Sequence, residues 1–286
     1  MHAGSIHRSL IHISIAAATL FTSPAAPKIE FLKVEPRVVE ERLRRVVNKN
    51  REREQVLHQL FEDAGCNGER LVEEPVKGSR TPNVICTLTG TEDMRVIVGA
   101  HYDKVENGHG VVDNWSGASL LPSLFEGLKS KSRRLTFVFA GFTDEEKGLV
   151  GSKDYVSRLT AEDKSKIRAM VNIDSLGLSD TKVWLSRADK TLARAAFGVA
   201  QSLKLPLGVV NVDKVGLSDS GPFIDRKVPS IDFHSVTQES LRILHSPQDT
   251  MSAVRMAEYE TSYALLVAYL AYLDVTAGTR SPDTSP

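Results

Sequence analysis

Residues 95–117 hold the side chains best suited to chemistry. An apolar run, residues 96–100, leads directly into His101 and Asp103, and a loop containing glycines then delivers Asp113. An imidazole and a carboxylate at the end of a buried strand, with a second carboxylate ten residues later, are typical of a metal site. Further ligands are therefore expected elsewhere in the chain.

More acidic residues and a second histidine follow the other apolar runs. Glu145 and Glu146 come shortly after the second run, Asp174 directly follows the third, and His245 lies beyond a later one. In an open α/β sheet, ligands bind beyond the carboxyl ends of the strands. All of these side chains are therefore expected to face one crevice.

So many carboxylates in one pocket need a counter-charge. Asp103, Asp113, Glu145, Glu146 and Asp174 would repel one another and raise one another's pKa unless cations were bound among them. Two histidines with carboxylates form a nitrogen and oxygen ligand set that suits zinc and could accept manganese or cobalt. The set is too large for one tetrahedral zinc but suits two metals that share a bridging carboxylate.

The elements that must position these residues are read from the apolar pattern. Three nearly continuous apolar runs are separated by helical patterns at residues 116–128 and 149–159, which indicates parallel strands with right-handed crossovers. The prediction is an α/β fold with a mixed, largely parallel central sheet flanked by helices on both faces. The three runs are residues 96–100, 135–140 and 169–173.

The flanking regions complete this prediction. Residues 38–65 have helical periodicity, and the charge run at 49–54 within them is interpreted as a solvated face or a kink. The last helix, near residues 252–273, is expected to pack in the core rather than to span a membrane. The other expected elements are an antiparallel pair at 69–75 and 83–88, a strand at 183–186, a helix at 192–203 and a strand at 228–233.

Length and charge limit the possible organisation. The 286 residues have a formal net charge of zero, so no global field favours nucleic acid or an anionic membrane. Residues 27–278 are predicted to form a single domain, followed by a disordered tail at 279–286. Residues 1–26 combine a basic region, a short apolar run and small residues, which predicts an export signal and a periplasmic or extracellular protein. An uncleaved anchor or a frayed extension is the alternative.

The two cysteines, Cys66 and Cys86, are too far apart in the sequence for a cysteine-pair metal motif. In an exported protein they could form one disulfide, or they could be two buried thiols. The sequence leaves both possibilities open.

Five motifs in order carry a family resemblance. The chain resembles the M28-type zinc aminopeptidases, whose pattern is HxD, DNxSG, EE followed by GLxGS, NxD, and HTxxDT. The resemblance covers about residues 43–273 and implies a zinc-exopeptidase fold of the phosphorylase/hydrolase-like type. Here the motifs read His101-Tyr102-Asp103, Asp113-Asn114-Trp115-Ser116-Gly117, Glu145-Glu146-Lys147-Gly148-Leu149-Val150-Gly151-Ser152, Asn172-Ile173-Asp174 and His245-Ser246-Pro247-Gln248-Asp249-Thr250.

The resemblance implies a role for each of these residues. Glu145 is the general base of a metal-activated water, and Asp103 holds His101 in one tautomer. A cis peptide is expected between Asp113 and Asn114. Two zinc ions are implied, with ligands His101 and Asp174 for one, Glu146 and His245 for the other, and Asp113 as the bridge.

The function expected from this resemblance is a zinc-dependent aminopeptidase acting on peptides with a free N-terminus. A single-zinc enzyme of the glutaminyl-cyclase type and a catalytically silent peptide-binding relative are the alternatives. Residues 218–223 depart from the family's SDHxPF pattern, because Ser220 replaces the histidine.

Several other residues have structural interpretations. Taken alone, His101 could be a structural histidine, and the two glutamates could form an exposed acidic turn. His109 and His234 lie outside the motifs and are expected to be structural or surface residues. The aromatic residues beside the motifs could line a pocket or pack beside it; they are Tyr102, Trp115 and Phe142.

Overall fold

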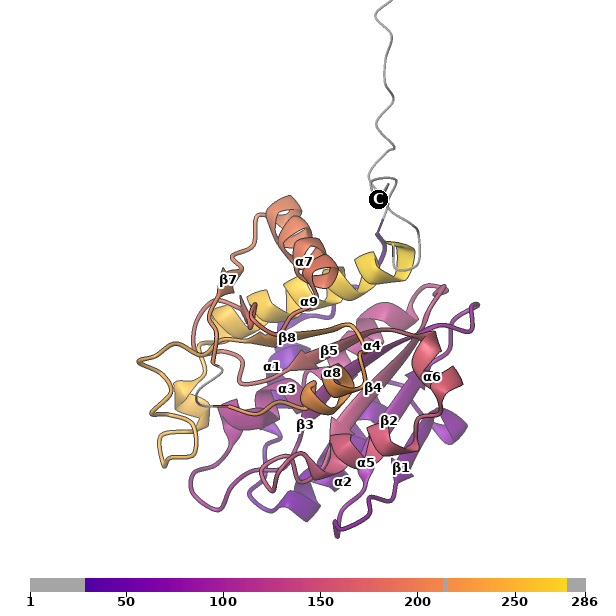
Figure 1. Ribbon diagram of the computed structural model, residues 1–286. Helices are drawn as coiled ribbons and strands as arrows, with labels where there is room; N and C mark the ends of the chain where they lie inside the picture. Colours follow the sequence, from indigo (N-terminus) through magenta and orange to yellow (C-terminus); the bar gives the residue numbers. More distant parts are fainter. Residues whose placement is uncertain (1–28, 213–215, 277–286) are drawn as a thin grey trace, which may run out of the picture.

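The computed structural model of the protein describes residues 29–212 and 216–276 (Figure 1). The predicted export signal and the predicted disordered tail lie outside the described residues. One eight-stranded sheet has the order β1-β2-β4-β3-β5-β8-β6-β7. The strands are β1 (Leu71–Glu74), β2 (Asn83–Leu88), β3 (Arg95–His101), β4 (Thr136–Phe142), β5 (Ile167–Ile173), β6 (Lys182–Val183), β7 (Gly208–Val209) and β8 (Ser230–His234).

The centre of the sheet is parallel, as the apolar runs predict. β4, β3, β5 and β8 are parallel neighbours, while β1 pairs with β2, and β2 with β4, in antiparallel fashion. β6 differs from the expected alternation, because it runs antiparallel to β8 and has only two residues. The chain turns directly after it, where the Arg187 N–H donates to the Trp184 carbonyl.

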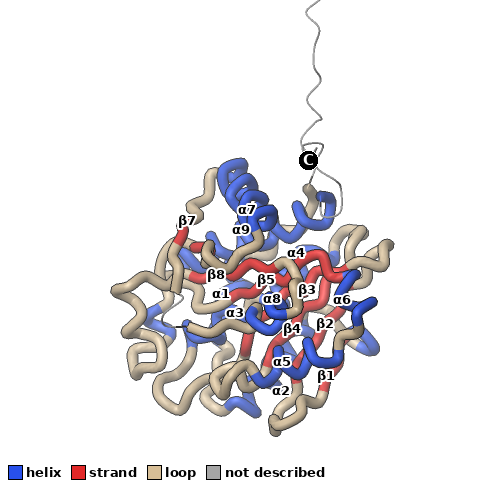
Figure 2. The backbone as a smooth tube through the Cα atoms, in the orientation of Figure 1, coloured by secondary structure: helices blue, strands red, loops and turns tan. Residues whose placement is uncertain are grey.

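Helices cover both faces of the sheet (Figures 1 and 2). The larger core lies against α1, α4, α7 and α9, and the smaller core lies against α5 and α8. The helices are α1 (Pro36–Arg44), α2 (Asn50–Asp63), α3 (Ser116–Ala118), α4 (Leu121–Lys129), α5 (Val150–Arg158), α6 (Ala161–Lys166), α7 (Lys190–Leu203), α8 (Gly221–Asp225) and α9 (Met256–Thr276).

One helical segment differs from the periodicity, and the last helix agrees with it. The expected helix at 116–128 is broken into α3 and α4, and Pro122 in the first turn of α4 suits a new helix start. α9 packs in the core with most of its residues buried, as expected. Within the described part of the chain, no helix combines the length and apolarity needed to cross a membrane.

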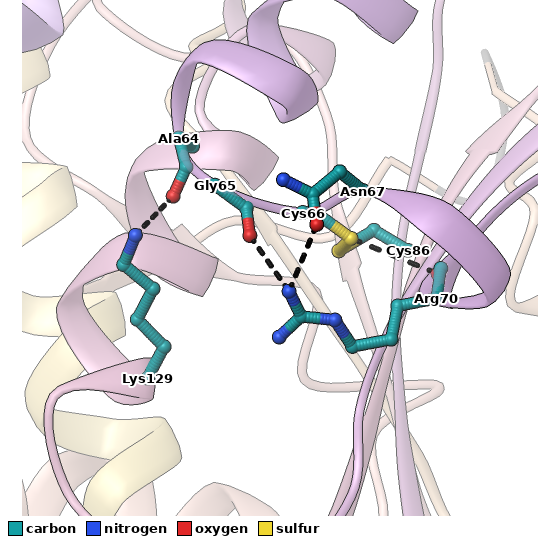
Figure 3. Close-up of a disulfide and its surroundings, with 7 residues drawn as sticks. All are labelled: Ala64, Gly65, Cys66, Asn67, Arg70, Cys86 and Lys129. Atoms are coloured by element: carbon teal, nitrogen blue, oxygen red, sulfur yellow. Dashed lines mark hydrogen bonds between the residues drawn. A yellow bond between two sulfur atoms is a disulfide. The ribbon is translucent and has the colours of Figure 1, made fainter.

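A disulfide joins Cys66, just after α2, to Cys86 in β2 (Figure 3). Both cysteines are fully buried. Around them, Lys129 of α4 donates to the Ala64 carbonyl, and Arg70 Nη2 donates to the Gly65 carbonyl at 3.0 Å. Of the two alternatives that the sequence left open, the structure therefore has the disulfide and not two buried thiols. The disulfide links the C-terminal end of α2 to the sheet.

Candidate metal centre

The predicted ligands gather at the carboxyl edge of three adjacent strands. β4, β3 and β5 are neighbours in the sheet. His101 is the last residue of β3, Asp174 directly follows β5, and Glu145 and Glu146 follow β4. His245 reaches the same place from the long loop between β8 and α9.

Asp113 lies between the two histidines. Its Oδ1 is 3.3 Å from His101 Nε2, and its Oδ2 is 3.1 Å from His245 Nε2. Each histidine has a further carboxylate, since His101 Nε2 is 3.8 Å from Asp174 Oδ1 and His245 Nε2 is 3.0 Å from Glu146 Oε2. By these contacts the side chains form a His101 group and a His245 group that share Asp113, and the ligand atoms of His101, Asp113 and Glu146 also lie within 4.8 Å of one another.

Glu145 faces the His101 group. Its Oε2 lies 3.9 Å from His101 Nε2. Burial raises the pKa of Glu145 to about 9, and the Asp219, Asp174 and Asp113 carboxylates add to this rise against the opposing effect of His101. Cations bound among these carboxylates would lower this pKa again, so that Glu145 could accept a proton and release it.

The Asp103 carboxylate lies near His101 and binds the backbone of Glu145 and Glu146. Its Oδ1 is 3.4 Å from His101 Nδ1, close to the expected partner but beyond a good hydrogen bond. The same carboxylate accepts the N–H groups of Glu145 at 3.0 Å and Glu146 at 3.2 Å. The two hydrogen bonds from the Glu145 and Glu146 amides were not predicted from the sequence, because no pattern shows which backbone amides a buried carboxylate will contact.

The loop that carries Asp113 is tightly held. The Asp113–Asn114 peptide is cis, as the resemblance implies. Gly108 has a φ of +76°, and a Cβ there would lie 2.2 Å from the Ser246 carbonyl oxygen, so only glycine fits. Asp249 accepts the N–H groups of Val112 at 2.6 Å and Asp113 at 3.2 Å.

The charges in the centre favour a bound cation. Burial alone would lower the pKa of His101, but the surrounding carboxylates, Glu145 foremost, raise it well above its usual value. Hydrogen bonds with Asp113 and Glu146 raise the pKa of His245 to about 10. Among the described residues, Glu146 Oε1 is buried without a hydrogen-bond partner, as is His101 Nδ1. Two imidazoles and several carboxylates with a buried unpaired oxygen fit a zinc-type ion.

The centre opens into a cavity of about 490 Å³. Beyond the metal-ligand candidates, its walls are largely apolar, which suits an organic side chain. The apolar wall residues include Trp184, Val212, Leu217, Val236, Leu241 and Leu244.

The three aromatic residues left open by the sequence pack beside the centre. Tyr102, Trp115 and Phe142 are fully buried. Tyr102 donates to the Pro82 carbonyl at 2.6 Å, and the Trp115 ring N–H donates to the Leu43 carbonyl at 3.0 Å. Their part in the fold is therefore structural.

The two extra histidines lie outside the ligand cluster: His109 is exposed, and His234 is buried and lines the cavity. His234 is held between the Val210 carbonyl, 2.9 Å from Nε2, and the Val236 N–H, 3.1 Å from Nδ1. His109 Nδ1 lies 3.0 Å from Asn48 Oδ1.

The position that departs from the family pattern is part of a buried polar cluster. Ser220 Oγ donates to Asp232 Oδ2 at 2.7 Å, and Ser218 Oγ donates to Asp232 Oδ1. The serine that replaces the histidine therefore binds a carboxylate of β8. This contact could not be read from the sequence, since it joins two distant elements.

Comparisons with known proteins find aminopeptidases among the proteins that this chain resembles. The aminopeptidase of Pseudomonas aeruginosa is 41% identical over 103 residues, which make up 35% of this chain and 19% of that protein. The zinc aminopeptidase BSAP from Bacillus subtilis superposes with a TM-score of 0.61 and 25% identity, covering 66% of this chain and 49% of that chain. A glutaminyl cyclase from an Acidobacteriales bacterium has a TM-score of 0.71 at 15% identity, covering 89% and 99%, and shows the fold alone.

The matched segment thus spans about a fifth of the Pseudomonas protein. The family model of peptidase family M28 matches residues 83–270, which contain every ligand candidate and Glu145. On this match the chain belongs to peptidase family M28.

Proposed function

We propose that this protein is a two-metal aminopeptidase that removes N-terminal residues from peptides. The observation that carries the proposal is the position of Asp113, whose two oxygens face two different histidines at 3.3 and 3.1 Å. Each histidine has its own second carboxylate, so these residues would hold two ions, with Asp113 shared between them. Zinc is the ion that the donor set favours.

The chain's own residues divide the remaining work. When bound, the metals would supply Lewis acidity and lower the pKa of a water molecule. Glu145 would accept a proton and pass it to the leaving amine, because its carboxylate borders both the ligands and the cavity. The apolar walls would receive the side chain of the N-terminal residue.

A panel of chromogenic aminoacyl substrates tests the proposal directly. Hydrolysis that stops with chelator and returns with zinc, at a content near two zinc ions per chain, is the expected result. A glutaminyl peptide belongs in the same panel, because cyclisation with one zinc per chain would indicate a cyclase instead. Zinc binding without turnover of any substrate would indicate a binding protein.

Glu145→Gln is expected to lower kcat by about 10²- to 10⁴-fold, because the proton acceptor is lost. Zinc content should stay at the wild-type value, since the neighbouring ligands are unchanged. Glu54→Gln is the matched control, because Glu54 is also a buried glutamate, burial likewise raises its pKa, to about 7, and it is not among the residues that line the cavity. Full activity of Glu145→Gln would contradict the assigned role.

We also infer that the protein acts outside the cytoplasm. The pairing of Cys66 with Cys86 supports this inference, because structural disulfides persist in oxidising compartments. Cell fractionation with mass spectrometry of the mature N-terminus tests it, and a cytoplasmic, full-length product would oppose it.

A further inference from the structure

The start of α2 grips the loop between His101 and Asp113. Three side chains make these contacts, and they are named here the α2 clasp: Asn48, Asn50 and Arg53. All three precede the residues that match the family model, which begin at residue 83. The family match therefore says nothing about them.

Arg53 is the centre of the clasp. Although charged, it is 0% exposed, so it does not belong to a solvated face; the alternative prediction of a kink fits the break between α1, which ends at Arg44, and α2, which begins at Asn50. Its Nη1 donates to the Tyr102 carbonyl at 3.1 Å, and its Nη2 donates to the carbonyls of His109 and of Gly110, the latter at 3.0 Å. One planar guanidinium thus ties both ends of the loop together.

These carbonyls lie close to the ligands in sequence. Tyr102 stands between His101 and Asp103, and Gly110 is three residues before Asp113. Arg53 also packs over the Trp115 ring, with its Cζ 5.6 Å from the ring centroid. Both sides of the Asp113 segment are therefore in contact with the same side chain.

The two asparagines of the clasp hold the middle of the loop. Asn50 Oδ1 accepts the Lys104 N–H at 3.1 Å, and Asn50 Nδ2 donates to the Lys104 carbonyl at 3.2 Å. Asn48 contacts His109. From the opposite side, Asp249 accepts the amides of Val112 and Asp113. The clasp thus binds carbonyls of the loop and the Lys104 amide, and Asp249 binds the amides at Val112 and Asp113.

The charge of Arg53 by itself works against a bound metal. A buried cation near the carboxylates Asp103, Asp113 and Glu146 repels a divalent ion that binds among them. Its four hydrogen-bond acceptors are all main-chain carbonyls, so its contacts serve the backbone rather than a carboxylate. Removal of Arg53 should therefore weaken metal binding if its positioning of the loop dominates, and should strengthen metal binding if its charge dominates.

We propose that Arg53 is a positioning residue that sets the metal affinity of the centre by fixing the loop that carries Asp113. The proposal rests on the proposed metal centre. It makes the start of α2 part of the functional unit, although α2 supplies none of the ligand candidates.

The test compares zinc affinity in four full-length variants by competition with a chromogenic chelator. Arg53→Lys keeps the positive charge but loses the planar guanidinium with its several N–H donors, and Arg53→Met loses both. Each variant should weaken zinc binding by about 10-fold or more. Asn50→Ala should weaken it a few-fold. Arg133→Lys is the matched control, because Arg133 is 4% exposed, binds the Leu128 and Glu30 carbonyls at 2.8 Å, and should keep wild-type affinity.

The outcomes separate the explanations. If Arg53→Met binds zinc as well as or better than wild type, charge dominates and the proposal is wrong. If Arg133→Lys, matched for Tm, loses as much affinity as Arg53→Lys, the effect is one of stability and the proposal is wrong. If the Arg53 variants do not fold, Asn50→Ala decides, because this side chain is only partly buried. A wild-type protein that binds no zinc would instead contradict the proposed function.

Discussion

The two halves of the metal centre are built differently. His101 is at the end of a central strand, and its side chain is 2% exposed, whereas His245 lies in a loop with a side chain that is 55% exposed. Asp174 follows a strand directly, and its N–H donates to the Phe233 carbonyl at 2.9 Å. The His245 residue itself has a φ of +57°, an uncommon conformation outside glycine.

This difference indicates that one half is preformed and the other must be held in place. A ligand on a strand end is ordered by the sheet before any metal binds, whereas a loop ligand loses conformational freedom on binding. Asp113 belongs to both halves, so its removal should weaken zinc binding in both.

Removing the shared group should have the largest effect. Asp113→Ala is expected to lower the zinc content of both halves, since each group loses one of its ligands. Activity should fall by about 100-fold or more. Metal analysis after gel filtration measures this directly. Asp274→Ala is the control: Asp274 is also buried, binds the Arg134 N–H at 2.9 Å, and should affect stability without affecting zinc. An unchanged zinc content in Asp113→Ala would rule out the bridge.

Removing one histidine at a time should show which half binds more tightly. His245→Ala should keep one zinc, bound about 10-fold more tightly than the zinc that remains in His101→Ala, because the His101 half is ordered beforehand. Equilibrium dialysis against a graded chelator series gives both affinities. The reverse order, or the loss of both ions from His245→Ala, would show that the loop half is the rigid one.

The smallest effect should be seen in proton release. Hydrogen bonds with carboxylates raise the pKa of His245 to about 10, and the carboxylates around His101 shift its pKa in the same direction, which favours protonated imidazoles before metal binds. Zinc needs neutral imidazoles, so binding at pH 7 should release protons, and the apparent affinity should rise with pH. Calorimetry in buffers of different ionisation enthalpy counts these protons. His245→Ala should release fewer, and equal release would contradict protonation of His245.

His101, Glu146 and Asp174 could be singled out from the sequence because each stands at or just after the end of an apolar run, whereas Asp113 and His245 lie in loops and were assigned through the family resemblance. The parallel order of β4, β3 and β5 follows from the same runs, and it brings the ligands together. Arg53 was misread, since periodicity treats a charge as a solvated side chain. Its burial depends on carbonyls from residues 102–110, which no local pattern reveals.

The direction of β6 and the pairing of the cysteines were also beyond the sequence. β6 has two residues, too few for a periodic pattern, and its partner β8 is distant in the chain. Cys66 and Cys86 are brought together by the pairing of β1 with β2, whose register places Leu71 opposite Cys86. Both features are set by tertiary contacts.

The disulfide bears on where a minimal active fragment can begin. A fragment that starts at Asn83 would hold every ligand candidate and the whole family match. It would lack Arg53 and Asn50, and it would leave Cys86 without its partner. The shortest autonomous unit should therefore start ahead of α1, since Trp115 also bonds to the Leu43 carbonyl in that helix.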